Sequence, residues 1–202
     1  MTSSTPDVFR LALFASGNGT NAERIVLYFK DNPRFKIGPV FYNRKQAYVA
    51  ERAARLGIEA IYLPDSRLKE PDTVLDLLRQ YGITHIVLAG YLSLIPAYLT
   101  SAYPQRIVNI HPALLPAYGG KGMYGHHVHE AVAAAKEKES GITIHLVNEH
   151  YDRGDILFQA RCALTSDDSP ERIAEKVHEL EYRYFPEVIE RWALQTLPPF
   201  QA

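Results

Sequence analysis

The sequence predicts an α/β protein: a Rossmann-like open sheet, mostly parallel with a C-terminal antiparallel pair, and helices on both faces. Short apolar runs alternate with segments of helical spacing through the first half of the chain, which is typical of βαβ units. The first run breaks into a glycine-rich turn that leads directly into a helix. Near the C-terminus, two apolar runs are separated only by a short loop, which favours antiparallel strands.

Five apolar runs are predicted to form the parallel strands. Four of them span residues 8–15, 37–42, 59–63 and 84–89, and the fifth ends at residues 107–108. Residues 22–29, 46–56 and 73–81 have helical spacing between them. Gly57 is suited to close the second of these helices, because glycine adopts the left-handed conformation of a C-terminal cap.

The length and composition predict one soluble globular domain that spans residues 1–202. With 22 basic and 23 acidic residues the net charge is −1, which gives no indication of a nucleic-acid surface. No apolar run approaches the roughly 18 residues that a membrane span needs. The single cysteine, Cys162, excludes an internal disulfide, and residues 1–6 lack the apolar stretch of a secretion signal. We therefore expect a cytoplasmic protein.

Residues 16–21, Ser-Gly-Asn-Gly-Thr-Asn, follow the first strand and precede a helix. A glycine-rich turn at a helix start can hold a phosphate with backbone N–H groups. A dinucleotide site is less well supported, because Ala22 stands where the third glycine of that motif belongs. A plain turn between a strand and a helix is the alternative interpretation.

Residues 109–116, Asn-Ile-His-Pro-Ala-Leu-Leu-Pro, follow the fifth strand. Pro112 cannot donate a ladder hydrogen bond, so the strand should end there. The residue before a proline is held extended, and therefore Asn109 and His111 should point to the same side. Ligands of open α/β sheets bind outside the carboxyl ends of strands. An amide and an imidazole at that place suit a reaction in which negative charge develops on oxygen.

The remaining chain predicts a loop, two strands, two helices and no metal site. Four glycines within residues 119–125 indicate a mobile loop that could act as a lid. The histidines at 126, 127 and 129 suggest metal ligands, but no cysteine or well-spaced carboxylate completes a site, so no metal is expected. A helix is predicted over residues 128–138.

Residues 142–148 and 156–162 are predicted to form the antiparallel pair. The loop between them holds Asp152 and Gly154, and His145 is expected to hold a hydrogen bond at the edge of the core. Ser169 and Pro170 are suited to the cap and first position of a last helix. That helix is expected to run to about residue 184, with a kink or restart at Pro186.

Residues 109–116 resemble the signature of the folate-dependent formyltransferases, Asn-x-His-Pro-Ser-Leu-Leu-Pro, with Ala113 in place of the serine. A second motif of that family follows at residues 141–147, Gly-Ile-Thr-Ile-His-Leu-Val, and 151–157, Tyr-Asp-Arg-Gly-Asp-Ile-Leu. The resemblance extends over about residues 9–192. Carried over to this sequence, the catalytic trio of the family falls on Asn109, His111 and Asp152.

The resemblance implies transfer of the formyl group of 10-formyltetrahydrofolate, a co-substrate, to the amine of glycinamide ribonucleotide in purine biosynthesis. A nearby Asp152 is expected to raise the pKa of His111 by favouring imidazolium. The family pattern places the ribonucleotide at Gly19, Thr20, Asn21 and Glu181. It places the folate at Arg67, Leu92, Ser93, Leu94, Ile95 and Asn109. The implied partners are small molecules, with no nucleic acid, membrane or metal, and the chain is expected to be a monomer or homodimer.

Three other functions are compatible with the same fold. A 10-formyltetrahydrofolate hydrolase shares the trio but has an extra N-terminal domain, for which a first strand at residue 8 leaves no room. Formyltransferases that act on another amine, such as methionyl-tRNA or a sugar, append C-terminal domains. A non-catalytic folate- or nucleotide-binding module would be expected to have lost a member of the trio. The complete trio favours an enzyme.

Overall fold

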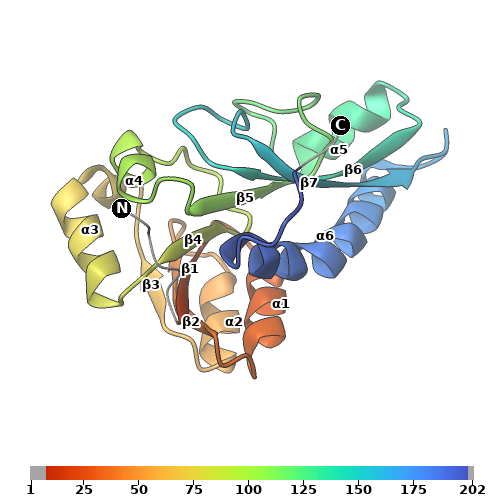
Figure 1. The fold of residues 1–202 in the computed structure, drawn as a ribbon. Helices are drawn as coiled ribbons and strands as arrows, with labels where there is room; N and C mark the ends of the chain where they lie inside the picture. The colour runs from red at the N-terminus through yellow and green to blue at the C-terminus, as the bar shows by residue number, and fades with distance from the viewer. Residues whose placement is uncertain (1–7, 200–202) are drawn as a thin grey trace.

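The computed structural model describes residues 8–199 as a seven-stranded sheet with helices on both faces (Figure 1). The strands are β1 (Phe9–Ala15), β2 (Phe35–Tyr42), β3 (Ala60–Tyr62), β4 (His85–Leu88), β5 (Ile107–His111), β6 (Glu139–Leu146) and β7 (Ile156–Ala163). The helices are α1 (Thr20–Phe29), α2 (Val49–Arg55), the 3₁₀ turn η1 (Arg67–Lys69), α3 (Pro71–Gln80), α4 (Ala97–Ala102), α5 (His126–Ala134) and α6 (Pro170–Ala193).

The strand order is β3-β2-β1-β4-β5-β6-β7. Strands β1 to β5 are parallel, β6 pairs antiparallel with β5, and β7 pairs antiparallel with β6. This confirms the predicted Rossmann-like sheet with its C-terminal antiparallel pair. After β3 the chain returns to the other side of β1, so the carboxyl ends of β1 and β4 flank a topological switch point, where open α/β sheets bind their ligands.

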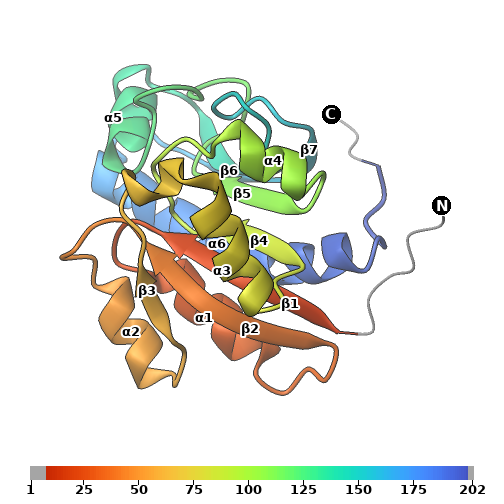
Figure 2. The same cartoon turned by 90° about the vertical axis from the view of Figure 1, so that its left-hand side faces the viewer.

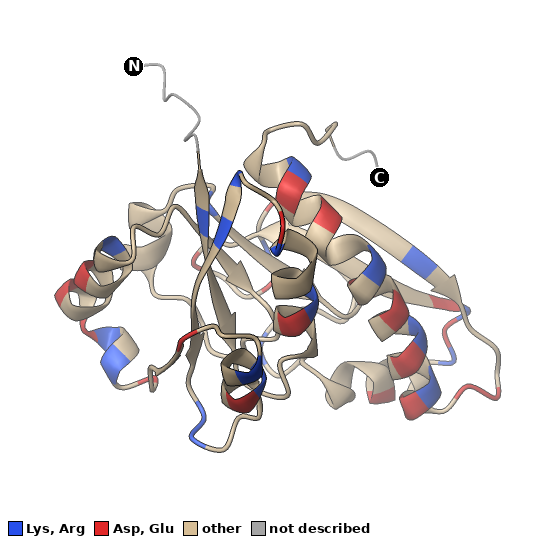
Figure 3. Cartoon of the chain, turned by 90° about the horizontal axis from the view of Figure 1, so that it is seen from below, with Lys and Arg blue, Asp and Glu red and all other residues tan. Residues whose placement is uncertain are grey.

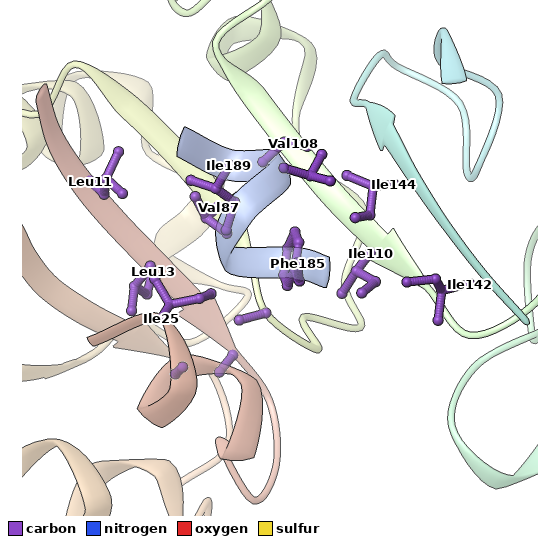
Figure 4. Packing of buried hydrophobic residues seen from close by; sticks show 14 of the residues in the cluster. Leu11, Leu13, Ile25, Val87, Val108, Ile110, Ile142, Ile144, Phe185 and Ile189 are labelled. Carbon is purple, nitrogen blue, oxygen red and sulfur yellow. The ribbon is translucent and has the colours of Figure 1, made fainter. Parts of the chain in front are cut away.

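Side chains alternate between two hydrophobic layers, as the two-residue period of a strand requires. In β1, Leu11 and Leu13 face the layer that α1, α2, α5 and α6 cover, whereas Ala12 and Phe14 face the layer of α3 and α4 (Figure 2). Figure 4 shows Phe185 of α6 packed among side chains of the central strands. Burying one such side chain stabilises the folded state by about 1.5–3 kcal/mol.

Several helix boundaries differ from those that the sequence predicts. Helix α1 begins at Thr20 rather than at residue 22, α2 begins at Val49 rather than at 46, and α5 spans His126–Ala134 rather than 128–138. Neither α4 nor η1 is indicated by the sequence pattern. Helix α6 continues through Pro186 without a restart, because the buried residues on either side of the proline anchor both halves to the sheet and offset the lost hydrogen bond.

Basic and acidic residues are interspersed along the helices (Figure 3). Several form ion pairs, of which Arg52 with Glu23 joins α2 to α1 at 2.5 Å. Within residues 8–199, no helix combines the length and the apolar character that crossing a bilayer requires.

Candidate active site

A cavity of about 580 Å³ opens at the carboxyl ends of the central strands. Its walls come from the turn after β1 at 17–21, the segment after β4 at 88–95 and the end of β5 at 109–112. The glycine-rich loop at 120–125 and residues 145–152 close other sides, and α6 contributes His178 and Glu181. Segments that are distant in the sequence therefore meet at the predicted place.

The predicted trio meets at one side of this cavity. Asn109 and His111 lie on the same side of β5, and Asp152 approaches from the loop after β6. Asp152 Oδ2 lies 3.6 Å from His111 Nδ1. Its carboxylate also accepts the backbone N–H of Gly120 at 2.9 Å. The glycine-rich loop is thereby tied to the candidate catalytic carboxylate.

His111 is buried, and its surroundings oppose a positive charge. Nε2 lies 2.8 Å from the carbonyl oxygen of Tyr118, to which it donates. Burial lowers the pKa of His111 below its ordinary value of 6.5, although Asp152 and the Tyr118 carbonyl act in the opposite direction. Asp152 thus raises the pKa of His111 as expected, but desolvation of the ring, which the sequence does not indicate, outweighs the carboxylate. The net effect of these surroundings favours the neutral ring in the free protein.

Asp152 remains an anion in this environment. Burial acts to raise its pKa, but His111 and the Gly120 N–H favour the charged form, and the pKa lies below its usual value of 3.8. Asp152 adopts a positive φ of 53°. At Gly154, a Cβ atom would come within 1.7 Å of the Leu146 carbonyl oxygen, so this turn requires glycine.

His145 is a site residue that the sequence reasoning placed only at the edge of the core. Its Nδ1 donates to the Leu146 carbonyl at 2.8 Å, which leaves Nε2 as an acceptor for the Asn109 Nδ2 amide at 3.0 Å. The same Nε2 lies 3.6 Å from Asp152 Oδ1. The antiparallel register pairs Asn109 with His145. His145 therefore fixes the orientation of the Asn109 amide and leaves its second N–H free.

We expect His145→Gln to lower turnover about tenfold, roughly the effect of one misoriented hydrogen bond. The effect should be absent when Asn109 is already alanine, because His145 acts through that amide. A double-mutant cycle on kcat measures this coupling. Additive losses in the double variant would show that His145 acts independently of Asn109.

The residues predicted to hold the folate form one wall, except for Arg67 and for Asn109, which lines the cavity from β5. Leu92, Ser93, Leu94 and Ile95 all line the cavity. The segment is held in place where the Leu92 N–H donates to Ser16 Oγ at 3.0 Å and Ser93 donates to Asp65 at 2.8 Å. Leu94 remains 42% exposed, and an apolar side chain left open in a cavity suits a flat heteroaromatic ring.

Arg67 does not join this wall. It begins the 3₁₀ turn η1, is exposed, and is absent from the residues that line the cavity. The turn faces outward because Leu68, next to it, is buried in the hydrophobic layer. A contact between Arg67 and a ligand stays a prediction.

The residues predicted to hold the ribonucleotide also line this cavity. Gly19, Thr20 and Asn21 start α1, and Asn21 Nδ2 donates to Glu181 Oε2 at 2.8 Å. Glu181 is buried, and burial raises its pKa despite the Asn21 hydrogen bond and nearby His178. The first N–H groups of a helix have no intrahelical acceptor and favour an anion.

Gly19 is required for the fold as well as for this end of the cavity. It has a φ of 77°, and an added Cβ would approach Val49 Cγ2 to 2.3 Å. A larger residue would push α2 away from α1. Substitution at Gly19 is therefore unsuitable for testing ligand binding alone.

Among residues 8–199, no three histidine, cysteine, aspartate or glutamate side chains are grouped so that they could hold a metal ion. His126 and His127 instead lie near Glu130, at 3.4 and 3.2 Å.

The sequence model of a family described as formyl transferase matches residues 9–189. The chain belongs to the formyl transferase family. The chain is 41% identical over 186 residues to a chloroplastic phosphoribosylglycinamide formyltransferase of Arabidopsis thaliana, with 89% of this chain and 64% of the relative covered. The Bacillus subtilis phosphoribosylglycinamide formyltransferase is 34% identical over 192 residues, with 90% of this chain and 93% of the relative covered.

The fold matches solved structures of formyl transferases as well. Glycinamide ribonucleotide transformylase 1 from Symbiobacterium toebii superposes with a TM-score of 0.85 at 29% identity, covering 96% of this chain and 94% of that one. The chain spans less than two thirds of two plant relatives, 64% of the Arabidopsis protein and 60% of that of Vigna unguiculata.

Proposed function

We propose that this formyl transferase moves the formyl group of 10-formyltetrahydrofolate to the amine of glycinamide ribonucleotide. The observation that carries the proposal is a single cavity lined by Asn109, His111 and Asp152, by an apolar segment at 92–95 and by a helix N-terminus at 19–21. A flat donor and a phosphorylated acceptor would then meet at the trio. The names of the relatives with high coverage support the same acceptor.

The wall at residues 92–95 would hold the folate ring, and the start of α1 would hold the phosphate of the acceptor. Binding at two such separate places aligns the amine with the formyl carbon, which converts binding energy into orientation. A bond forms between the amine nitrogen and that carbon, and the bond from the carbon to the folate nitrogen breaks. Negative charge develops on the formyl oxygen between these events.

Asn109 would stabilise that oxygen with the amide N–H that His145 leaves free. His111 contributes charge, since protonation of Nδ1 turns its 3.6 Å contact with Asp152 into an ion pair. This proton would come from solvent, would be favoured by the developing oxyanion together with Asp152, and would return to solvent when the oxyanion collapses. The proton that the amine loses would pass through water beside Asp152 to the folate nitrogen, so that atoms and charge balance.

The test measures tetrahydrofolate release by absorbance, with and without glycinamide ribonucleotide. We expect release only when the ribonucleotide is present, with one formylglycinamide ribonucleotide formed for each tetrahydrofolate. Release of formate that is indifferent to the ribonucleotide would identify a hydrolase. No release under either condition would contradict an enzymatic role.

A further inference from the structure

The backbone at the start of the glycine-rich loop contacts both His111 and Asp152. The Tyr118 carbonyl accepts the Nε2 hydrogen of His111 at 2.8 Å, and the Gly120 N–H donates to Asp152 Oδ2 at 2.9 Å. The same carboxylate oxygen lies 3.6 Å from His111 Nδ1. Residues 118–120 therefore set how the imidazole faces the carboxylate.

The Tyr118 carbonyl selects one tautomer of His111. A carbonyl oxygen can only accept a hydrogen bond, so Nε2 carries the hydrogen. In the neutral ring Nδ1 is then unprotonated, and it faces the Asp152 carboxylate, which is also an acceptor. A ring beside a carboxylate alone would place its hydrogen on Nδ1 and donate it to that carboxylate. Contact with residues 118–120 thus keeps Nδ1 open to take up a proton.

This part of the backbone does not hold its conformation by local preference. Tyr118 has a φ of 56°, and the left-handed region costs free energy for a residue with a Cβ atom. Gly119 and Gly120 follow it and add no side chain that could hold the backbone in place. The conformation therefore depends on contacts with other parts of the protein.

The Tyr118 side chain makes such a contact. Its hydroxyl donates to Glu137 Oε1 at 2.7 Å. This hydrogen bond raises the pKa of Tyr118 to about 12, so the hydroxyl keeps its proton at neutral pH. Glu137 lies in the turn after α5, where its N–H donates to the Val132 carbonyl at 3.3 Å. Tyr118 thus joins the end of α5, through its hydroxyl, to His111, through its carbonyl.

We propose that the hydrogen bond between Tyr118 and Glu137 positions His111 for formyl transfer, by holding the tautomer in which Nδ1 can take up a proton. This role rests on the proposed function, since it concerns the reaction assigned to the site. In the part of the chain that the structure describes, neither Tyr118 nor Glu137 lines the cavity, so both act through the backbone of residues 118–120. Without the bond, a larger share of molecules releases this backbone, and the ring turns its hydrogen toward Asp152.

Steady-state kinetics of formyl transfer measure the effect on turnover. Tyr118→Phe removes only the hydroxyl, and Glu137→Ala removes only its acceptor. Each is expected to lower kcat about threefold to tenfold, the effect of losing one hydrogen bond, while KM for both substrates changes less than kcat. Glu137→Gln keeps an acceptor oxygen and should restore most of the turnover. The double variant Tyr118→Phe/Glu137→Ala should be no slower than Tyr118→Phe alone, because both changes break the same bond.

Tyr81→Phe is the matched control. Tyr81 donates to Glu59 Oε2 at 2.8 Å in a second tyrosine–glutamate pair on the surface, and both residues lie outside the described lining of the cavity. This variant should turn over like wild type. A loss in Tyr118→Phe no larger than that of the control, or additive losses in the double variant, would overturn the proposal.

Nitrogen chemical shifts of the His111 ring report its tautomer without any substrate. They are measured by NMR on protein with labelled histidine, above neutral pH, and the His111 signals are identified by their loss in His111→Asn. Wild type and Tyr81→Phe should show a protonated Nε2 and an unprotonated Nδ1. In Tyr118→Phe and Glu137→Ala the shifts should move toward a protonated Nδ1.

The two measurements separate this proposal from the proposed function. A tautomer that shifts in Tyr118→Phe, in a protein that transfers no formyl group, would reject only the formyl-transfer reaction. Formyl transfer with an unchanged His111 tautomer in Tyr118→Phe would reject only the role of the Tyr118–Glu137 bond. Thermal unfolding of each variant accompanies both measurements, and Glu137→Ala, an exposed position, decides the result if Tyr118→Phe does not fold.

Discussion

Asn109→Ala is expected to lower turnover by about 10²–10³-fold, the usual loss on removing one preorganised oxyanion donor. The amide is preorganised because one of its N–H groups donates to His145 Nε2 at 3.0 Å. This hydrogen bond also fixes the orientation of the second N–H. Its contribution arises when charge develops on the formyl oxygen, so binding of the ribonucleotide should change little. Measuring kcat and KM for both substrates distinguishes these effects.

Asn148→Ala is a matched control for this variant. Asn148 lines the same cavity, but its amide donates to the Arg153 carbonyl at 3.1 Å. The control should retain most of the turnover. Near-normal kcat in Asn109→Ala would remove Asn109 from the mechanism, and an equal loss in both variants would point to a general disturbance of the cavity.

Asp152→Asn should lower turnover about 10²–10⁴-fold, the range for a group that supports proton transfer. The substitution keeps the shape and an acceptor for the Gly120 N–H but removes the negative charge. Because that charge raises the pKa of His111 against the effect of burial, its loss should lower this pKa further. The limb of the pH–rate profile that reports His111 is therefore expected to move toward acid.

Asp155→Asn provides the comparison, since Asp155 is exposed in the same loop and does not line the cavity. The limbs of the pH–rate profile are obtained by measuring steady-state rates over a range of pH for both variants and for wild type. If Asp152→Asn keeps the wild-type rate and profile, Asp152 is only a turn residue. A shift of the His111 limb toward alkali would contradict the role of the charge.

The features that the sequence predicted correctly depend on neighbours along the chain. The strand ends before Pro112 because proline lacks an N–H, and Asn109 and His111 share a side because strand residues alternate. Ser169 accepts the Arg172 N–H as a helix cap at the expected position. The motif spacing was likewise sufficient to bring Asp152 into the same site, through the resemblance to the family.

Tertiary structure decided the features that depend on contacts between distant segments. The register of β6 against β5 sets His145 opposite Asn109, and no local pattern encodes a register. The net pKa of His111 depends on how much protein surrounds its ring, so burial reversed the sign that a carboxylate neighbour alone predicts. Helix α6 continues through Pro186 because it packs on the sheet. Arg67 lies outside the cavity because its neighbour Leu68 is packed in the hydrophobic layer. Local steric constraints can be predicted from the sequence, whereas strand register and the desolvation of a side chain are established only when the chain has folded.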